Sequence, residues 1–265
     1  MRLFFFFIFL SHCALASHCN YTNQGQTLKC SHKSLTLDGL YAKREVLFAL
    51  PESPPPPKGY PVALFFQGSF FPMKFERNKS DPFGGFNEIL TIQALLEAGF
   101  MVIAPKAGAN LFWQSNLIGI IYDLSSDKYL INKILTEIKA QTFGHADTEN
   151  IFALGISSGG YMTDRMAHSH KHQRFNALAI ASASYAKCGG PYCPLPDEID
   201  PNHPPTLFMH GRIDPVVPII TMRLYDKKLR ENGVKTKKIV QNTATHQWLK
   251  KAPKAVVSWF KAHLR

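Results

Sequence analysis

The feature that most constrains the fold is the pentapeptide Gly155-Ile156-Ser157-Ser158-Gly159, which directly follows the apolar run Ile151-Phe152-Ala153-Leu154. A helical pattern begins at Tyr161, so a strand must turn into a helix within very few residues. Such a turn is so sharp that glycine must flank the serine, because a side chain at either position would collide with neighbouring backbone. The turn places the Ser157 hydroxyl at the edge of a sheet, beside the N-terminus of a helix.

Short apolar runs alternate with helical patterns along most of the chain. Continuous apolar runs are typical of parallel strands buried on both faces, so the alternation predicts an α/β fold with a mostly parallel sheet. Only about two dozen residues separate Ala181 from Thr206, which leaves no room for a large lid domain. Strands are expected at residues 45–50, 61–66, 100–104, 151–154, 177–181, 206–209 and 237–241, and helices at residues 88–98, 128–141, 161–170, 219–231 and 253–263.

The N-terminus differs in character from the rest of the chain. Arg2 precedes a short apolar run, and Ala14-Leu15-Ala16 has the spacing of a signal-peptidase cleavage site. The run is far shorter than the roughly 20 residues that span a bilayer. We therefore expect residues 1–16 to be a removable secretory signal and residues 17–265 to form a single domain. The protein is then exported, to the periplasm or the medium, without stable insertion into a membrane.

Cysteine usage agrees with export. Once Cys13 leaves with the signal, four cysteines remain, and four cysteines allow three pairings. We favour Cys19 with Cys30 and Cys188 with Cys193, because the members of each pair are close in the sequence. Reduced thiols are the less favoured alternative outside the cytosol.

The chain is basic, with a formal net charge of +11 that falls by one when the signal is removed. Such a charge can attract nucleic acid or lipid headgroups. However, the densest basic run, around Lys227 and Lys228, fits a solvated helix face, and no aromatic side chains are interleaved with it. We expect no nucleic-acid partner. The oligomeric state stays open.

A serine alcohol reacts only when a base takes its proton, so a histidine and an orienting carboxylate must accompany Ser157. A serine in Gly-x-Ser-x-Gly between strand and helix is typical of the α/β-hydrolase fold, in which the acid follows the nucleophile and the histidine comes last. Asp214 follows the expected strand 206–209 and a glycine turn, and His246 follows the last expected strand. We expect these two residues to complete the triad.

Other histidines fit this role less well. His263 lies on the terminal helix, and His210 precedes Asp214 and is expected to brace that loop. His168, His170 and His172 suggest a metal, and His168 and His172 share a helix face, yet no carboxylate or thiolate motif accompanies them. We interpret the run as a basic helix end and expect neither a metal nor a cofactor.

The tetrahedral intermediate of acyl transfer needs two hydrogen-bond donors for its oxyanion. The backbone N–H of Ser158 is one. The second is expected after the strand 61–66, where Gly68 lets the backbone approach; the N–H of Ser69 is the first choice and that of Gly68 the alternative. Gln67 stands where many related hydrolases carry histidine, but a backbone donor does not depend on that side chain.

Beyond the pentapeptide, several longer motifs are distinctive. They are Phe66-Gln67-Gly68-Ser69-Phe70-Phe71-Pro72, Asp81-Pro82-Phe83-Gly84-Gly85, Gly160-Tyr161-Met162-Thr163, Ala183-Ser184-Tyr185-Ala186 and His203-Pro204-Pro205-Thr206-Leu207-Phe208. With these motifs, nearly all of the expected mature chain resembles the extracellular depolymerases of medium-chain-length polyhydroxyalkanoates. The resemblance implies that Ser157, Asp214 and His246 are the triad and that the substrate is a water-insoluble polyester of 3-hydroxy acids.

The resembling family lacks a separate polymer-binding domain, so adsorption requires apolar surface near the active site. The stretch that contains Phe112, Trp113, Leu117, Ile118, Ile120, Ile121 and Tyr122 is a candidate, with an ordinary core role equally favoured. Tyr161 and Trp248 are further candidates for substrate binding.

Two other functions remain open. A general carboxylesterase or lipase, or an esterase acting on polymer-linked acyl groups, would use the same triad, and clearing of a polyester latex distinguishes it from a depolymerase. A non-catalytic secreted binder with the hydrolase fold is less favoured, because a binder has no need for all three triad residues.

Overall fold

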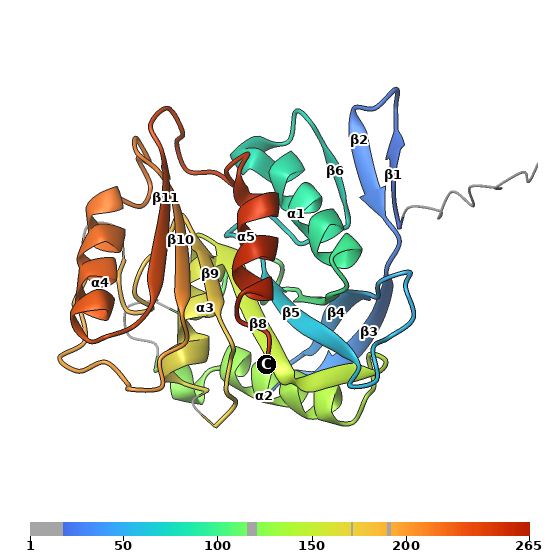
Figure 1. Ribbon diagram of the computed structural model, residues 1–265, viewed down its shortest axis with the longest axis horizontal. Helices are drawn as coiled ribbons and strands as arrows, with labels where there is room; N and C mark the ends of the chain where they lie inside the picture. The colour runs from blue at the N-terminus through green and yellow to red at the C-terminus, as the bar shows by residue number, and fades with distance from the viewer. Residues whose placement is uncertain (1–17, 116–120, 171, 190–191) are drawn as a thin grey trace, which may run out of the picture.

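The computed structural model describes residues 18–115, 121–170, 172–189 and 192–265. Its centre is an eight-stranded sheet in the order β11-β10-β9-β8-β5-β7-β4-β3 (Figure 1). The strands from β11 to β7 run parallel, whereas β4 is antiparallel to both of its neighbours. The strands are β3 (Lys33–Asp38), β4 (Lys43–Ala49), β5 (Tyr60–Phe66), β7 (Met101–Pro105), β8 (Ala146–Ile156), β9 (Leu178–Ala181), β10 (Thr206–Gly211) and β11 (Thr236–Gln241).

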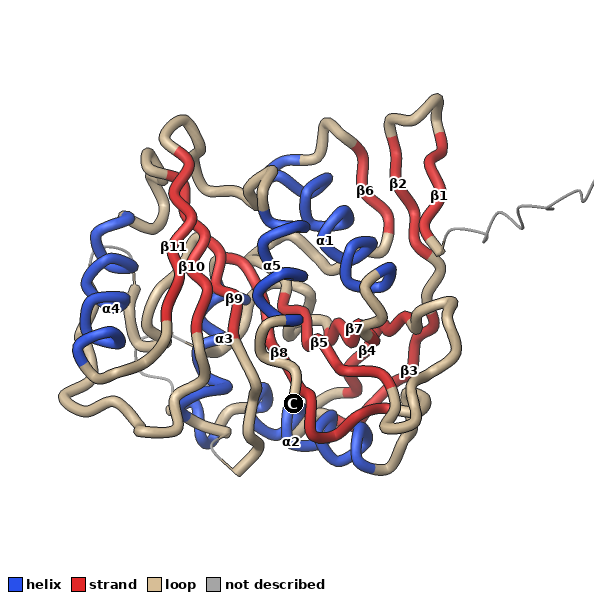
Figure 2. The backbone as a smooth tube through the Cα atoms, in the orientation of Figure 1, coloured by secondary structure: helices blue, strands red, loops and turns tan. Residues whose placement is uncertain are grey.

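Helices cover both faces of this sheet. Helices α1 and α5 lie side by side on one face, and α2, α3 and α4 cover the other (Figures 1 and 2). The α-helices are α1 (Gly85–Glu97), α2 (Ser126–Lys139), α3 (Ser158–His168), α4 (Ile219–Glu231) and α5 (Ala252–Lys261); the 3₁₀ turns are η1 (Pro82–Gly84) and η2 (Tyr122–Leu124).

The alternation of side chains along each central strand divides the core. In β5, Ala63 and Phe65 pack toward α1 and α5, while Leu64 and Phe66 pack toward α2 and α3. All four are fully buried. A strand buried on both faces must be apolar at every position, and this explains the continuous apolar runs in the sequence.

A second, small sheet lies beside α1. It has the order β1-β2-β6, with β1 (Cys19–Thr22), β2 (Thr27–Cys30) and β6 (Glu76–Asn78), and all pairs are antiparallel. The disulfide Cys19–Cys30 closes the β1–β2 hairpin, and Cys188–Cys193 closes a loop after β9. Both pairings are those expected from the sequence.

The predicted fold class is confirmed, and each expected strand and helix has a counterpart. The boundaries differ by a few residues, most in β8, which begins five residues before the expected strand at 151. The antiparallel strands β1, β2, β3 and β6 are additions that the apolar runs did not predict. Across the described part of the chain, no helix has the length and apolar character required to cross a membrane.

Candidate active site

Ser157 lies at the turn between β8 and α3, with φ 55° and ψ −123°. This positive φ is rare for a residue with a side chain and costs conformational energy. The flanking glycines make the turn possible: a Cβ on Gly155 would lie 2.4 Å from the carbonyl oxygen of Gly159, and one on Gly159 would lie 2.2 Å from that of Phe66. The steric reason for the Gly-x-Ser-x-Gly pattern therefore holds in this fold.

His246 and Asp214 meet at the same edge of the sheet. The loop after β10 contributes Asp214 and the loop after β11 contributes His246. Nδ1 of His246 lies 2.9 Å from Oδ2 and 3.1 Å from Oδ1 of Asp214, and both residues are buried. The backbone N–H groups of Val216 and Val217 also donate to Oδ1, each at 2.9 Å. The carboxylate is therefore held in one orientation against the imidazole.

His210 braces this loop. Its fully buried ring donates from Nε2 to the carbonyl oxygen of Val217 at 2.9 Å, and the same nitrogen lies 3.4 Å from Oδ2 of Asp214. Burial alone raises the pKa of Asp214, but hydrogen bonds from His210 and His246 outweigh it, and the pKa lies well below its ordinary value. Asp214 stays ionised and can stabilise a positive charge on His246.

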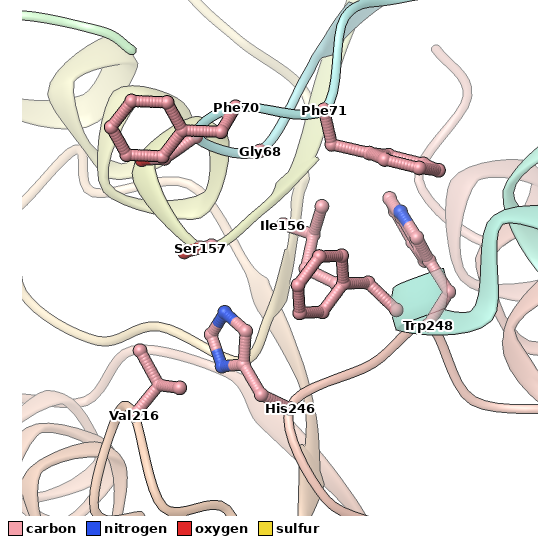
Figure 3. A pocket seen from close by; sticks show the side chains of 10 residues that line it. Gly68, Phe70, Phe71, Ile156, Ser157, Val216, His246 and Trp248 are labelled. Atoms are coloured by element: carbon pink, nitrogen blue, oxygen red, sulfur yellow. The ribbon is translucent and has the colours of Figure 1, made fainter. Parts of the chain in front are cut away.

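A pocket of about 320 Å³ opens beside Ser157. Figure 3 shows Ser157 between Phe70 and His246, with one ring nitrogen of His246 directed toward the serine. Apart from His246, no titratable side chain lines the described pocket wall, so it suits an uncharged apolar group. The lining residues are Gly68, Ser69, Phe70, Phe71, Phe83, Ile156, Ser157, Val216, His246 and Trp248.

Two of the expected oxyanion donors lie at this pocket, and the third follows Ser157 directly. Ser158 is the first residue of α3, and Gly68 and Ser69 belong to the pocket lining. A Cβ on Gly68 would lie 3.8 Å from Cβ of Ser157, so the loop after β5 passes close to the serine. This placement is compatible with donation from the backbone at either Gly68 or Ser69.

Gln67 has a positioning role that the sequence did not reveal. Its fully buried side chain accepts from the backbone N–H of Met73 at 3.3 Å and of Ala107 at 3.1 Å, and donates to the carbonyl oxygen of Asn110 at 3.4 Å. Its own carbonyl oxygen accepts from Nε1 of Trp113 at 3.1 Å. Gln67 thereby joins the loop after β5 to the loop after β7. A polar glutamine placed between an apolar strand and a glycine was the feature of the sequence that could have indicated this role.

The expected polymer-binding role of Trp113 is wrong. The Trp113 ring has no exposed surface and packs edge-on against Phe66. Its indole N–H donates to the carbonyl oxygen of Gln67, so the buried polar atom has a partner inside the protein. Tyr161 is also buried, away from the pocket lining, in the core cluster of α3 and α4. Both are structural residues.

Of the other residues expected to bind substrate, some lie at or near the pocket and others do not. Trp248 lines the pocket, and Phe112 is half-buried with its ring 6.1 Å from that of Phe70. Tyr122 is buried and Ile121 is exposed, whereas Leu117, Ile118 and Ile120 lie outside the described residues. The sequence reasoning missed these lining residues as binding candidates: Phe70, Phe71, Phe83, Ile156 and Val216.

The fold and the arrangement of Ser157, His246 and Asp214 at its carboxyl edge are those of an α/β-hydrolase. Solved structures agree in fold: a ferulic acid esterase with a TM-score of 0.62 at 15% identity, covering 90% of this chain and 99% of that one, and a sugar hydrolase from Lactococcus lactis with a TM-score of 0.61 at 14% identity, covering 88% and 98%. No protein-family model matches the chain.

Sequence similarity narrows the class. The chain is 42% identical over 262 residues to the poly(3-hydroxyoctanoate) depolymerase of Pseudomonas fluorescens, an alignment that covers 95% of this chain and 93% of the relative. It therefore belongs to the poly(3-hydroxyoctanoate) depolymerase family and is a carboxylic ester hydrolase.

Proposed function

We propose that this protein is a secreted serine esterase that hydrolyses water-insoluble polyesters of medium-chain 3-hydroxy acids. The observation that carries the proposal is the apolar pocket in which Ser157 and His246 face each other (Figure 3). Such a pocket suits an alkyl side chain beside a scissile ester. The Pseudomonas fluorescens relative, named for a polyester whose repeat unit carries such a side chain, supports this substrate class.

The reaction proceeds through an acyl-enzyme on Ser157. His246 takes the serine proton through the ring nitrogen that faces Ser157, while Asp214 holds Nδ1–H of the same ring and stabilises the imidazolium. Oγ of Ser157 attacks the ester carbonyl, and the oxyanion accepts hydrogen bonds from the backbone N–H of Ser158 and of Ser69 or Gly68. His246 then protonates the leaving alcohol, and water releases the acid by the reverse steps.

The rim of the pocket supports binding to an apolar solid. Phe70, Phe83 and Val216 line the pocket and yet are 70%, 48% and 53% exposed. Phe70 and Phe83 also have positive φ angles of 57° and 56°, a conformation that costs energy for an aromatic residue. Exposed, strained phenylalanines beside the nucleophile fit direct contact with polymer side chains.

Export is supported by two disulfides in a chain of this size and by the expected signal at residues 1–16. Sequencing the N-terminus of protein recovered from the culture medium or the periplasm tests it. A first residue near Ser17 is expected, and an intact Met1 would contradict the signal.

The catalytic proposal is tested with Ser157→Ala and His246→Ala, assayed on a poly(3-hydroxyoctanoate) latex, on a soluble short-chain ester and by fluorophosphonate labelling. Both variants should lose turnover by roughly 10⁴-fold or more with the fold unchanged, and Ser157→Ala should lose labelling. His145→Ala, at an exposed histidine, is the control. Substantial activity in either variant would refute the triad.

A general carboxylesterase is the second candidate, supported by the ester-hydrolase fold. The wild-type protein distinguishes the two functions. Hydrolysis of the soluble ester without any clearing of the latex would establish the general esterase and exclude the depolymerase.

A further inference from the structure

A second polar cluster lies behind the active site, at the far end of the helix that begins after Ser157. Asp164 and His168 occupy the last turns of α3, His203 precedes β10, and Tyr225 lies on α4. Asp164 and Tyr225 have no exposed surface, His203 is 6% exposed, and the side chain of His168 is 16% exposed. One possible ligand atom from each of Asp164, His168 and His203 lies within 4.8 Å of the other two.

The hydroxyl of Tyr225 joins the three groups. It lies 2.8 Å from Oδ1 of Asp164, 2.9 Å from Nε2 of His168 and 3.1 Å from Nε2 of His203. Nε2 of His168 is also 3.3 Å from Oδ2 of Asp164. Four short polar contacts therefore converge in a buried space.

These contacts need more protons than the neutral side chains carry. Nδ1 of His203 lies 2.9 Å from the carbonyl oxygen of Pro204 and must donate a proton to it. In a neutral His203 the other ring nitrogen, Nε2, then has no proton and carries a lone pair. The single hydroxyl proton of Tyr225 cannot serve both that lone pair and the carboxylate of Asp164. A proton on Nε2 of His168 satisfies only the contacts of His168. Either the lone pair of His203 or the carboxylate of Asp164 therefore faces the Tyr225 oxygen with no proton between them. A bound cation would supply the missing positive charge.

The surroundings also match those of metal ligands. A ligating histidine commonly donates its other ring N–H to a carbonyl oxygen, as His203 does to Pro204. A ligating carboxylate is commonly held by a further hydrogen bond, and Oδ2 of Asp164 accepts the backbone N–H of Ala186 at 2.7 Å. These bonds orient the lone pairs of His203 and Asp164 toward the centre of the cluster.

We propose that Asp164, His168 and His203 bind a zinc ion, with the Tyr225 hydroxyl as the fourth group. Mixed imidazole and carboxylate ligands suit zinc, and four protein groups are typical of a structural rather than a catalytic site. Bonds of about 2.0–2.2 Å separate the ligands of a tetrahedral zinc ion by roughly 3.3–3.6 Å. The contacts of Tyr225 and the Asp164–His168 pair, at 2.8–3.3 Å, lie at or below that spacing. The ligand atoms of Asp164, His168 and His203 lie within 4.8 Å of one another, so these side chains must shift when an ion enters.

The ion would tie together three segments that are far apart in the sequence. These are the C-terminal end of α3, the segment before β10 and the middle of α4. The bound ion would hold the C-terminal end of α3 against α4. The other end of α3 begins at Ser158, next to Ser157. His168 gives access to the ion, since its side chain is the most exposed of the four.

The test measures zinc in untagged protein expressed with zinc supplementation and purified without chelators. Elemental analysis should find about one zinc ion per chain. Chelation should lower the melting temperature, and ZnCl₂ should restore it, because an ion that binds the native state stabilises it. Asp164→Asn and His203→Gln should weaken zinc binding by roughly 100-fold or more, measured by calorimetry. His172→Gln, at an exposed histidine four residues beyond His168, should bind as the wild type does.

The wild-type measurements stand even if a ligand variant fails to fold. Wild-type protein without zinc that gives neither binding heat nor a melting shift with ZnCl₂ would overturn the proposal, and the missing partner would then be a proton. Zinc retained in both ligand variants, or lost in His172→Gln, would equally overturn it. The result is independent of the esterase assays, because none of these residues lines the pocket of Ser157.

Discussion

At the scale of single residues, backbone contacts rather than side chains decide the conformation around Ser157. Gly155 and Gly159 lie so close to each other and to the end of β5 that neither has room for a methyl group. The positive φ of Ser157 persists because these contacts enforce it. The position of the Ser157 side chain therefore depends on packing against β5 as much as on its own turn.

Gly159→Ala should destabilise the protein by at least about 2 kcal/mol, because the new Cβ would lie 2.2 Å from the carbonyl oxygen of Phe66 and 2.3 Å from that of Gln67. Urea unfolding measures the loss. Gly108→Ala is the matched control, since its Cβ would meet only one atom, at 3.7 Å. Equal stability of the two variants would show that β5 and α3 can separate without cost.

The buried side chain of His170 should make the stability of the fold depend on pH. Burial lowers its pKa from 6.5 to about 3, helped by the nearby charges of Lys128 and His172 and opposed by Asp123. Between these two pKa values the unfolded chain binds the extra proton, so stability falls as the pH decreases from about 6.5 toward 3. At pH 5 the loss due to this residue is about 2 kcal/mol relative to pH 7.

His170→Gln should remove this part of the acid sensitivity. The variant keeps a group that can bond to the Tyr122 hydroxyl, which lies 3.0 Å from Nε2 of His170. The free energy of unfolding at pH 7 and pH 5 is the measurement, with His145→Gln as the control. The same loss between the two pH values in variant and wild type would show that His170 is not a buried neutral ring.

At the scale of elements, the central strands could be predicted and the small ones could not. Strands buried on both faces carry an apolar side chain at every position, which is a strong local signal. β1 has three exposed residues out of four, and β6 has only three residues in all. Such strands form because a neighbouring strand offers hydrogen bonds. For β1 that neighbour is β2 of the same hairpin, and for β6 it is the same β2, which is distant in the sequence.

The hairpin of β1 and β2 depends on its disulfide. Replacing Cys19 and Cys30 by alanine should cost about 3 kcal/mol of stability, because an 11-residue closure no longer restricts the unfolded chain. The same change at Cys188 and Cys193, which are five residues apart, should cost about 0.6 kcal/mol less. Unfolding of the two double variants compares them directly. The reverse order would mean that contacts in the folded loop, not chain entropy, dominate.

At the scale of the whole molecule, apolar surface gathers at the pocket mouth from loops after different strands. Phe70 follows β5, Val216 follows β10, and Phe83 lies in the turn before α1. The carbonyl oxygen of Phe83 accepts the N–H of Trp248 at 2.9 Å, and the ring of Phe83 lies 6.2 Å from that of His246. The mouth is thus assembled from segments that only the completed fold brings together.

Phe70→Gly and Phe83→Gly should reduce clearing of a polyester latex about tenfold or more, and reduce hydrolysis of a short soluble ester much less. Glycine suits the positive φ at both positions, so the stability of the fold should not suffer. Parallel latex, soluble-ester and unfolding assays separate these effects, with exposed Tyr41→Ala as the control. Equal losses on both substrates would refute a role in contact with the polymer.

The sequence by itself determined the α/β order of elements, the glycines around Ser157, and the chain order of Asp214 and His246. These features are local, because a strand, a turn or a loop position imposes its requirement on neighbouring residues. Tertiary structure alone decided that Trp113 and Tyr161 are core residues, that Gln67 joins two loops, and which aromatic residues reach the mouth. Burial and hydrogen bonding between distant segments depend on how the helices pack on the sheet. An aromatic residue looks the same in the sequence whether it lies in the core or at the pocket mouth.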